Sequence, residues 1–437
     1  MKQRTGFGYG CNQLRGGRTG WIGRRVTVAL ALTCSLLTFG MTGVASSSPG
    51  AYQLGNISDL TAGFISPGVP WSNGIIIAIK AANKSGGVIG HKIVIGHKIV
   101  NGVRIVTRHR IVTRHPIVLT TVDSLGTTTG GMSAFSQLAY SDHVLAIAGL
   151  GNSSIDVALT SVAQAQKVTL LESGPPTSLL QAPFVLPYTP ALTAQAAAIS
   201  DYLLSSAARA QAGGVPNVAI VAFDNPAGHS FAAAIGGYVQ AGGGTIAGQY
   251  FVAPTLTDYT SYAAQIKAAG ANEIADEPDA EHSQILMNDL TAIGVHNTLP
   301  FAASAFGDAD KVPWASYAAV NEYNGTGNSK AALAYQKAAH AAGYDPATAH
   351  LIEGYAAGEM LIQGLTSCGW PCSSSKLYSK LQNYTGDLNG LALGGFSNNT
   401  SAGHLGPVWA RMQLYSASGT PTSKYTRTIN FLAQVGN

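Results

Sequence analysis

Apolar runs of strand length and of helix length alternate along most of the chain. Short β-branched runs, as in 144–148 and 218–223, are followed by longer segments whose apolar residues recur at helical spacing, as in 155–166 and 230–241. This alternation predicts parallel sheets with helices on both faces. The pattern also predicts strands at 62–65, 117–122, 168–172 and 273–275, a loop at 66–71, helices at 73–83, 193–210, 259–269, 283–293, 329–342 and 347–365, and a terminal antiparallel ribbon at 406–415 and 426–431.

Residues 91–120 repeat one six-residue unit five times, as HKIVIG, HKIVNG, VRIVTR, HRIVTR and HPIVLT. Because six is an even number, each copy keeps its side chains on the same faces of a strand. An Asn-Gly pair at 101–102 lies between two β-branched runs, which is the strongest short-range hairpin signal. We therefore predict that 93–100 pairs with 103–110 and that 92–115 is an inserted β-hairpin, after which 117–122 resumes the interrupted strand.

The chemistry of this insert leaves two interpretations open. It has six basic residues and no acid, so it could contact an anionic wall polymer or lipid, or it could be a solvated finger without a partner. Repeat expansion explains its histidines at six-residue spacing more simply than a metal site does. Neither face of the predicted ribbon is purely apolar, so we expect no side of it to be fully buried.

Residues 1–45 have the order of a secretory signal, which is basic, then apolar, then small. Cleavage after Ala45 would release the remainder. The apolar run 26–44 is also close to the ~20 residues that span a bilayer, so an uncleaved anchor is the alternative. We expect an exported protein that is extracellular, attached to the cell surface or periplasmic.

The composition limits the class of protein. A chain of 437 residues that is 46% hydrophobic and 11% charged is long enough for two domains and is neither disordered nor a nucleic-acid binder. The formal net charge of +4 is misleading. Residues 1–45 and 92–115 contribute six positive charges each and no acid, so the rest of the chain has a net charge of −8.

Two cysteines lie outside the targeting segment, at Cys368 and Cys372, with three residues between them. In an oxidising compartment such a local pair predicts a structural disulfide, and the spacing does not match a redox or zinc motif. The sequence contains no P-loop, no Cys/His metal spacing and no nucleophile elbow. We therefore predict a protein that is not an enzyme and uses no cofactor or metal.

Omitting 92–115 joins the flanking segments into GGVIGH-PIVLTTVDSLGTTTGG. The joined sequence resembles the first strand-helix-strand unit of ABC-transporter solute-binding proteins of the branched-chain amino-acid-binding family. The resemblance covers about 55–425, and the order and spacing of its motifs together are fairly specific. The other motifs are SPGVPWSNG (66–74), AGLGNSSIDVA (148–158), LLESGPPT (170–177), VAIVAFDNPAGHSF (218–231) and DYTSYAAQIKAAGANEI (258–274).

The resemblance implies an α/β fold of two doubly wound parallel-sheet lobes, joined by three crossings, with a ligand cleft between them (the type I periplasmic binding fold). Lobe 1 would comprise 51–188 and 318–412, and lobe 2 would comprise 189–317 and 413–437. Open parallel sheets bind ligands beyond the carboxyl ends of their strands, which agrees with a site in the cleft. The hairpin 92–115 should then project from lobe 1, away from the cleft.

The resemblance also implies contacts on lobe 1 to a ligand carboxylate. Ser153 would offer its hydroxyl and backbone amides at the start of a helix, where anions bind, although Ser153 or Ser154 would cap the helix in any case. Thr177 aligns with a carboxylate-binding threonine, and Pro175 with a carbonyl contact to the ligand ammonium. Trp71 either covers an apolar part of the ligand or lies half-buried at the surface. The full candidate set on this lobe is Trp71, Asn152, Ser153, Ser154, Ser173, Pro175 and Thr177.

The second lobe departs from the family pattern. The glutamate that pairs with the ligand ammonium aligns with Ser304, and aromatic positions align with Ala227 and Pro278. The resemblance therefore implies that the anion-binding half of the site is kept and the ammonium-binding half is lost. Carboxylates at strand ends could replace it or could be solvated loop residues; these are Asp224, Glu277, Asp279 and Glu281.

Together these features predict an exported, monomeric solute-binding protein without a nucleic-acid partner. It would capture a small carboxylate-bearing solute, amino-acid-like or related, and deliver it to the permease of an ABC importer. The alternative is a surface sensory or interaction module that kept the fold and lost transport. An amidase or similar enzyme on this fold would need a nucleophile-base pair, which the sequence does not show.

Overall fold

The computed structural model describes residues 50–101, 103–305, 314–401 and 403–416, together with 422 and 428–430. The predicted signal segment 1–45 lies outside the described residues, as does most of the turn predicted within the terminal ribbon. No helix in the described part of the chain is long and apolar enough to cross a membrane.

The first sheet has five parallel strands in the order β4-β1-β5-β6-β7. Alternate residues of these strands point to opposite faces. Ala146 and Ala148 of β5 therefore pack with α1 and α10, whereas Ile147 between them packs with α2 and α3. The strands are β1 (Tyr52–Ser58), β4 (Ile117–Asp123), β5 (Ala146–Leu150), β6 (Thr169–Glu172) and β7 (Val185–Pro187), and the helices are α1 (Ile65–Lys84), α2 (Thr128–Ser136), η1 (Gln137–Ser141), α3 (Ser153–Gln166), η2 (Thr177–Leu179) and α10 (Leu351–Cys368).

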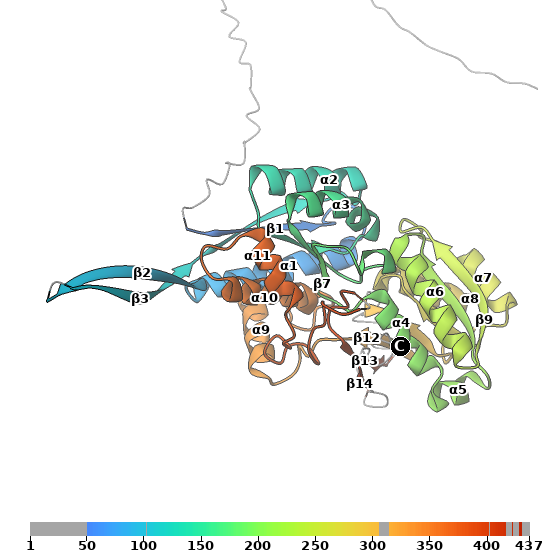
Figure 1. Ribbon diagram of the computed structural model, residues 1–437. Helices are drawn as coiled ribbons and strands as arrows, with labels where there is room; N and C mark the ends of the chain where they lie inside the picture. Colours follow the sequence, from blue (N-terminus) through green and yellow to red (C-terminus); the bar gives the residue numbers. More distant parts are fainter. Residues whose placement is uncertain are drawn as a thin grey trace, which may run out of the picture. The chain divides into compact units, whose positions relative to one another are not determined.

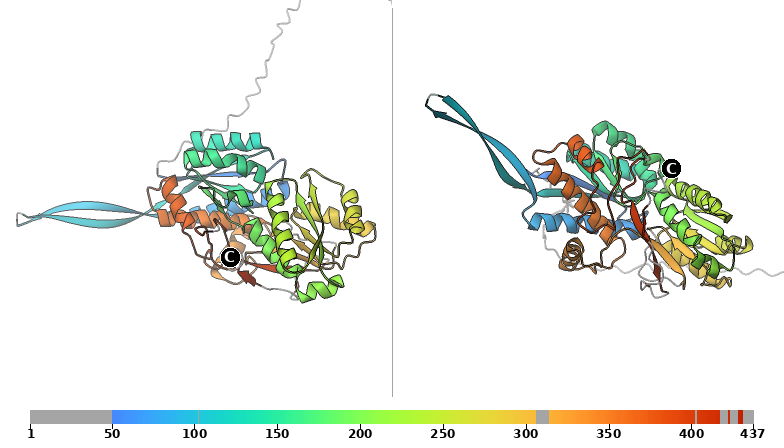
Figure 2. Two further views of the ribbon diagram at one scale, coloured as in Figure 1. Left: turned by 45° about the vertical axis from the view of Figure 1, so that its right-hand side comes forward. Right: turned by 60° about the horizontal axis from the view of Figure 1, so that its bottom comes forward.

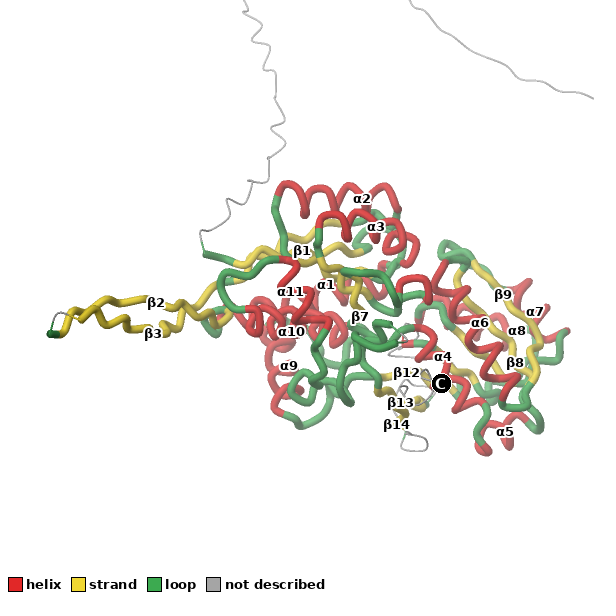
Figure 3. The backbone as a smooth tube through the Cα atoms, in the orientation of Figure 1, coloured by secondary structure: helices red, strands yellow, loops and turns green. Residues whose placement is uncertain are grey.

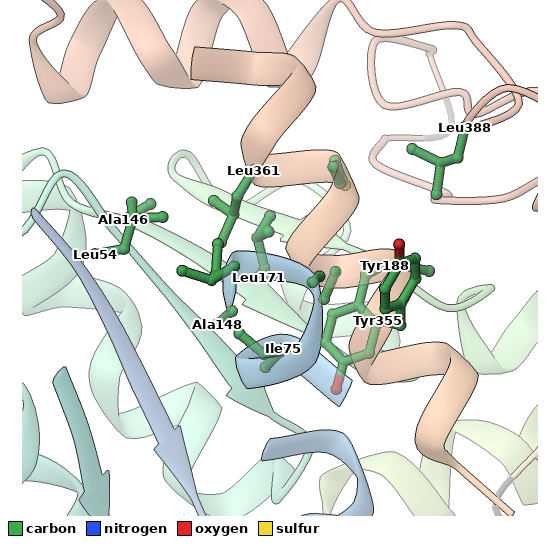
Figure 4. Packing of buried hydrophobic residues seen from close by; sticks show 14 of the residues in the cluster. Leu54, Ile75, Ala146, Ala148, Leu171, Tyr188, Tyr355, Leu361 and Leu388 are labelled. Carbon is green, nitrogen blue, oxygen red and sulfur yellow. The ribbon is translucent and has the colours of Figure 1, made fainter. Parts of the chain in front are cut away.

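Figure 4 shows the core beneath α1 and α10, where Leu54, Ala146 and Ala148 from the strands approach Ile75 and Leu361 from the helices. All five side chains are essentially inaccessible to solvent. Burial of this apolar surface fixes the two helices on one face of the sheet.

The second sheet has the order β14-β13-β12-β11-β10-β8-β9, in which the strands from β12 to β9 are parallel and β13 and β14 are antiparallel. Helices α4 and α6 cover one face and α7 and α8 the other. The strands are β8 (Asn217–Phe223), β9 (Thr245–Val252), β10 (Glu273–Asp276), β11 (Phe301–Ala303), β12 (Tyr317–Asn321), β13 (Trp409–Tyr415) and β14 (Thr428–Asn430), and the helices are α4 (Leu192–Leu203), α5 (Ser206–Ala212), α6 (Pro226–Ala241), α7 (Thr260–Ala268) and α8 (Ala280–Ala292).

The chain passes three times between the two lobes. It leaves the first sheet after β7, returns to lobe 1 after β12 to form α9 (Lys330–Ala341), α10 and α11 (Ser374–Gln382), and re-enters the second sheet at β13. The lobe boundaries expected at 317 and 412 fall within β12 and β13, and both strands pair in the second sheet.

Two local predictions near the start of lobe 1 are wrong. The predicted strand 62–65 and loop 66–71 are replaced by a bend and by the first turns of α1, and the strand is β1 instead. Pro67 is compatible with the start of a helix, because the first backbone N–H groups of a helix have no intrahelical partner and Pro67 removes one of these. Pro70 lies inside α1. The predicted helix 193–210 is interrupted, since Ser205 caps a new helix by accepting a hydrogen bond from the amide of Ala208.

The predicted hairpin is confirmed. Strands β2 (Val88–Val100) and β3 (Val103–His115) pair in the predicted register and extend beyond the helices and sheets of lobe 1 (Figures 1, 2 and 3). Near the tip Ile99 is 73% exposed and Val106 is 53% exposed, so neither side chain is covered by another element. At the base, the ring of His115 stacks on Trp370 at 4.1 Å. The disulfide predicted between Cys368 and Cys372 is present beside Trp370.

Candidate functional site

Two adjoining hollows lie where the strands of both sheets end. The first hollow encloses about 250 Å³ and the second about 300 Å³ of space outside the atoms, part of it open to solvent. Phe64, Trp71 and Gly151 line both, so the hollows form one continuous site, which we call the cleft. The first hollow is lined in addition by Ile57, Ser58, Asp59, Gly68, Ser124, Gly149, Leu150, Asn152, Ile155 and Asp156, and the second by Pro67, Phe223, Asn225, Ala227, Glu277 and Asp279.

The topology explains why these residues meet. Several of them directly follow the last residue of a parallel strand, as Asp59 follows β1, Gly151 follows β5 and Glu277 follows β10. The carboxyl ends of parallel strands share one edge of a sheet, and here the edges of the two sheets face each other across the cleft. The cleft therefore lies where the fold predicts a ligand.

Trp71 forms the wall between the two hollows. Its indole Nε1 donates a hydrogen bond to Glu353 of α10, and its ring is 2% exposed. A Cβ atom added to Gly151 would lie 2.4 Å from the ring, so only glycine allows the β5–α3 loop to approach the indole this closely. Trp71 is therefore a buried part of the site and not a half-buried surface residue.

The start of α3 differs from the expected capping pattern. The cap residue is Asn152, and it makes no side-chain cap hydrogen bond. Its amide nitrogen instead donates to Asp59 at 3.0 Å. Ser153 accepts a hydrogen bond from the backbone N–H of Ala227 in lobe 2 at 3.2 Å, and Ser154 is exposed. The prediction that a serine caps this helix is thus wrong, because these polar groups bind distant segments that the local sequence does not reveal.

The remaining candidates of lobe 1 lie outside the lining of the hollows. The Ser173 hydroxyl is hydrogen-bonded to that of Thr189 at 3.0 Å. The Pro175 carbonyl accepts from the amide of Leu192 at 3.4 Å. The exposed Thr177 donates its backbone N–H to Ser230 in lobe 2 at 3.1 Å.

In lobe 2 the structure distributes the candidates unequally. Glu277 and Asp279 line the second hollow. Asp224 is exposed and pairs with His229 at 2.9 Å. Ser304 is buried, and its hydroxyl donates to the backbone carbonyl of Glu277 at 2.9 Å.

Two buried carboxyl groups that sequence reasoning missed lie on the lobe 1 side. Asp156, in the first turn of α3, lines the first hollow, and Glu172 is the last residue of β6. Burial raises the pKa of the Glu172 carboxyl to about 8. Burial also raises the pKa of Asp156 well above its usual value, and the nearby Glu172 and Asp59 raise it further. The sequence signal for these two residues is an acidic residue inside each of the apolar runs 155–166 and 168–172, where acids are uncommon.

Burial affects the pKa of Glu277 in lobe 2 in the same direction. It raises the pKa of Glu277 to about 7, although the carboxylate accepts a hydrogen bond from the amide of Phe223 at 2.9 Å. Asp279 caps α8 and accepts from Nδ1 of His282 at 2.7 Å. Burial lowers the pKa of His282, but this hydrogen bond and the charge of Asp279 raise it by more, so the pKa lies above its ordinary value.

Acidic residues therefore predominate among the ionisable residues that line the cleft. Its lining includes four acidic residues, and none of the lysines or arginines in the described part of the chain belongs to it; the acids are Asp59, Asp156, Glu277 and Asp279.

Comparison with known proteins identifies the family. The family described as periplasmic binding protein matches residues 51–417, and the chain belongs to this family. No curated protein matches the sequence. The match places the chain among solute-binding proteins and not among enzymes, and it implies a protein that acts outside the cytoplasm.

Solved structures share the two-lobed fold at low identity. An ABC-transporter substrate-binding protein from Aeropyrum pernix has a TM-score of 0.69 at 15% identity and covers 86% of this chain and 95% of its own. The branched-chain amino-acid transporter protein LivJ from Streptococcus pneumoniae, in complex with isoleucine, has a TM-score of 0.67 at 15% identity and covers 87% and 99%. A solute-binding protein from R. palustris, in complex with benzoate, has a TM-score of 0.64 at 16% identity and covers 87% and 96%.

Proposed function

We propose that the protein captures a small solute outside the cytoplasm and delivers it to the permease of an ABC importer. The observation that supports this proposal most directly is the position of the cleft. Residues that follow β1 and β5 of lobe 1 face residues that follow β8 and β10 of lobe 2 across one continuous space. Such a site binds by enclosing the ligand between lobes and needs no covalent chemistry.

The contacts between the lobes are suited to opening. Hydrogen bonds join Ser153 to Ala227 and Thr177 to Ser230, and the rings of Phe64 and Phe223 meet edge to face at 5.0 Å. Water can replace hydrogen bonds of this kind at little net cost when the lobes separate. We infer that the three crossings act as the hinge, and that the described arrangement is the closed one.

For the solute we propose a small molecule that bears a carboxylate, amino-acid-like or related. Its carboxylate would lie near the start of α3, where the helix presents backbone N–H groups and the positive end of its dipole, beside Asn152 and Ser153. Isoleucine and benzoate, the ligands of two similar proteins, both contain a carboxylate. Trp71 would cover the apolar part of the solute, and Glu277 would face it from lobe 2.

Native mass spectrometry of the purified protein tests the binding function without knowledge of the solute. We expect a co-purified small molecule that is released on denaturation and rebinds with defined stoichiometry in calorimetry. A Gly151→Leu variant should lose this mass, because its side chain would enter the space against Trp71. The matched control Gly214→Leu should keep it, since no atom lies within 4 Å of a Cβ at that position. A folded protein that neither co-purifies with nor rebinds any small molecule would contradict the proposal.

A surface sensory or interaction module is the second candidate, and the projecting hairpin of β2 and β3 is the feature that favours it. Transport separates the two. Loss of the protein should abolish uptake of the identified solute if it serves an importer, and should leave uptake unchanged if it only senses the solute.

A further inference from the structure

Asp156 and Glu172 are two carboxyl groups without the partners that buried carboxyl groups ordinarily have. Asp156 is 1% exposed and Glu172 is fully buried. None of their four oxygens has a hydrogen-bond partner within the described part of the chain. An unpaired buried polar group costs free energy, and such groups in native structures call for an explanation.

The neighbouring Asp59 shows what a structural carboxylate looks like in this cleft. It accepts hydrogen bonds from the amide of Phe64 and the side chain of Asn152, both at 3.0 Å, and from the hydroxyl of Ser124. These bonds tie the end of β1 to α1 and α3. No described residue forms such a bond with the side chain of Asp156 or Glu172, so a purely structural role does not account for them.

Glu273 provides a second comparison, away from the cleft. This residue begins β10, is fully buried, and also lacks hydrogen-bond partners for both oxygens among the described residues. However, the positive charge of Arg209 acts on it. The charged groups that act on Asp156 are both acids, Glu172 and Asp59. A counter-charge is therefore present for Glu273 and absent, among the described residues, for the pair at the cleft.

The surroundings of the pair suit a cation. Asp156 lines the first hollow together with Trp71 and Phe64, whose ring faces attract positive charge. From lobe 2, Glu277 and Asp279 add two more acids on the other side of the indole. The lining combines the acidic residues with the aromatic rings of Phe64, Trp71 and Phe223, and none of its described residues has a basic side chain.

We propose that the solute carries more positive than negative charge and that an ammonium group of the solute binds in the first hollow against Asp156, with Trp71 beside it. This inference rests on the proposed solute-binding function and specifies its ligand. A carboxylate of the same solute can still lie at the start of α3, but the solute has at least one ammonium in excess. Solutes that lack an ammonium group should therefore bind more weakly than solutes that carry one.

When the solute binds, the protein releases one proton for the ammonium group that it takes up. In the solute-free protein the pair holds protons, since both carboxyl groups are buried without a counter-charge. The ammonium supplies that counter-charge, one carboxyl ionises, and its proton leaves to the solvent. No bond of the solute is made or broken.

A panel of probes on one carbon skeleton tests this inference with the purified protein. The probes are cadaverine (net charge about +2), lysine (about +1), 6-aminohexanoate (about 0) and hexanoate (about −1), at pH 7. We expect cadaverine and lysine to bind more tightly than 6-aminohexanoate in calorimetry, and hexanoate to bind most weakly. Titration in two buffers of different ionisation enthalpy should show the release of about one proton per bound cadaverine. Equal or tighter binding of hexanoate, or proton uptake on binding, would overturn the inference while leaving the solute-binding function intact.

Two substitutions test whether Asp156 is the residue that binds the ammonium group. Asp156→Asn should weaken cadaverine by about 30-fold, without weakening hexanoate. Glu273→Gln, which changes an equally buried carboxyl outside the cleft, should change neither. An Asp156→Asn protein that binds cadaverine as tightly as the unaltered protein would overturn the assignment. If no probe binds, the inference fails, whereas the proposed function fails only if native spectra also show no co-purified solute.

Discussion

Replacing Glu172 with glutamine should flatten the dependence of stability on pH. The pKa of this buried carboxyl is about 8 in the folded protein, against a reference value of 4.5. A carboxyl group with a raised folded-state pKa binds its proton more tightly in the folded than in the unfolded chain. The stability it contributes is therefore complete below pH 4.5 and is lost as the pH rises toward 8.

The magnitude follows from this interval. One proton of difference changes the free energy of unfolding by about 1.4 kcal/mol per pH unit. Across the interval from 4.5 to about 8 the loss is at most on the order of 5 kcal/mol. Glutamine does not titrate, so the Glu172→Gln variant should lack this loss.

Urea unfolding of the solute-free protein between pH 5 and pH 8 measures the effect. We expect the unaltered protein to lose stability with a slope steeper by about one proton than that of Glu172→Gln. Glu273→Gln should flatten the slope similarly, because the pKa of Glu273 is also raised to about 8. Parallel curves for the unaltered protein and Glu172→Gln would show that Glu172 is ionised in the folded state, and the reasoning would be refuted.

Further predictions concern Trp71 and its surroundings. Gly151→Ala should reduce solute affinity and cost about 1–3 kcal/mol of stability, because its Cβ would lie 2.4 Å from the indole; Gly237→Ala, with no atom within 4 Å of the added Cβ, should be neutral or slightly stabilising in thermal unfolding. Trp71→Phe removes the hydrogen bond to Glu353 and should cost about 1–3 kcal/mol in chemical unfolding; an unchanged midpoint would show that this bond contributes nothing net.

The order of elements and the hairpin could be predicted from sequence because their signals are local. The six-residue repeat and the Asn-Gly turn define the pairing of β2 with β3 residue by residue, and the pairing of Ile93 with Arg110 confirms it. By contrast, β1 was missed because its buried polar residues depend on distant partners. Asn56, for example, donates to Ser72 of α1 at 2.7 Å.

The same limit applies to the cleft. Glu277 could be predicted as a site residue because it follows a predicted strand. Trp71 could be predicted because it belongs to a recognisable loop motif. For Asp156 and Glu172 the only signal is a single acid in an apolar run, which does not show what the acid contacts. Only the parallel pairing of β5 with β6 brings α3 and the end of β6 together. Their lack of partners is a property of the packed structure and has no signature in the chain.

Deleting residues 92–115 should leave folding and solute binding nearly unchanged. The excision joins His91 to Pro116, so a histidine again precedes this proline, as His115 does now. That position matters, because the ring of His115 stacks on Trp370 and its Nδ1 lies 2.7 Å from the carbonyl of Gly50.

The strand that follows the excision keeps its own anchors. Asn83 holds Ile117 by a pair of 2.8 Å hydrogen bonds, and β4 pairs with β1 from Ile117 onward. The residues removed do not line either hollow. We therefore expect the free energy of unfolding to change by no more than about 1 kcal/mol, as for substitutions at exposed sites, and calorimetric solute affinity to be retained. A deletion variant that fails to fold or to bind would mean that the hairpin completes lobe 1, and that its origin as a dispensable insertion is wrong.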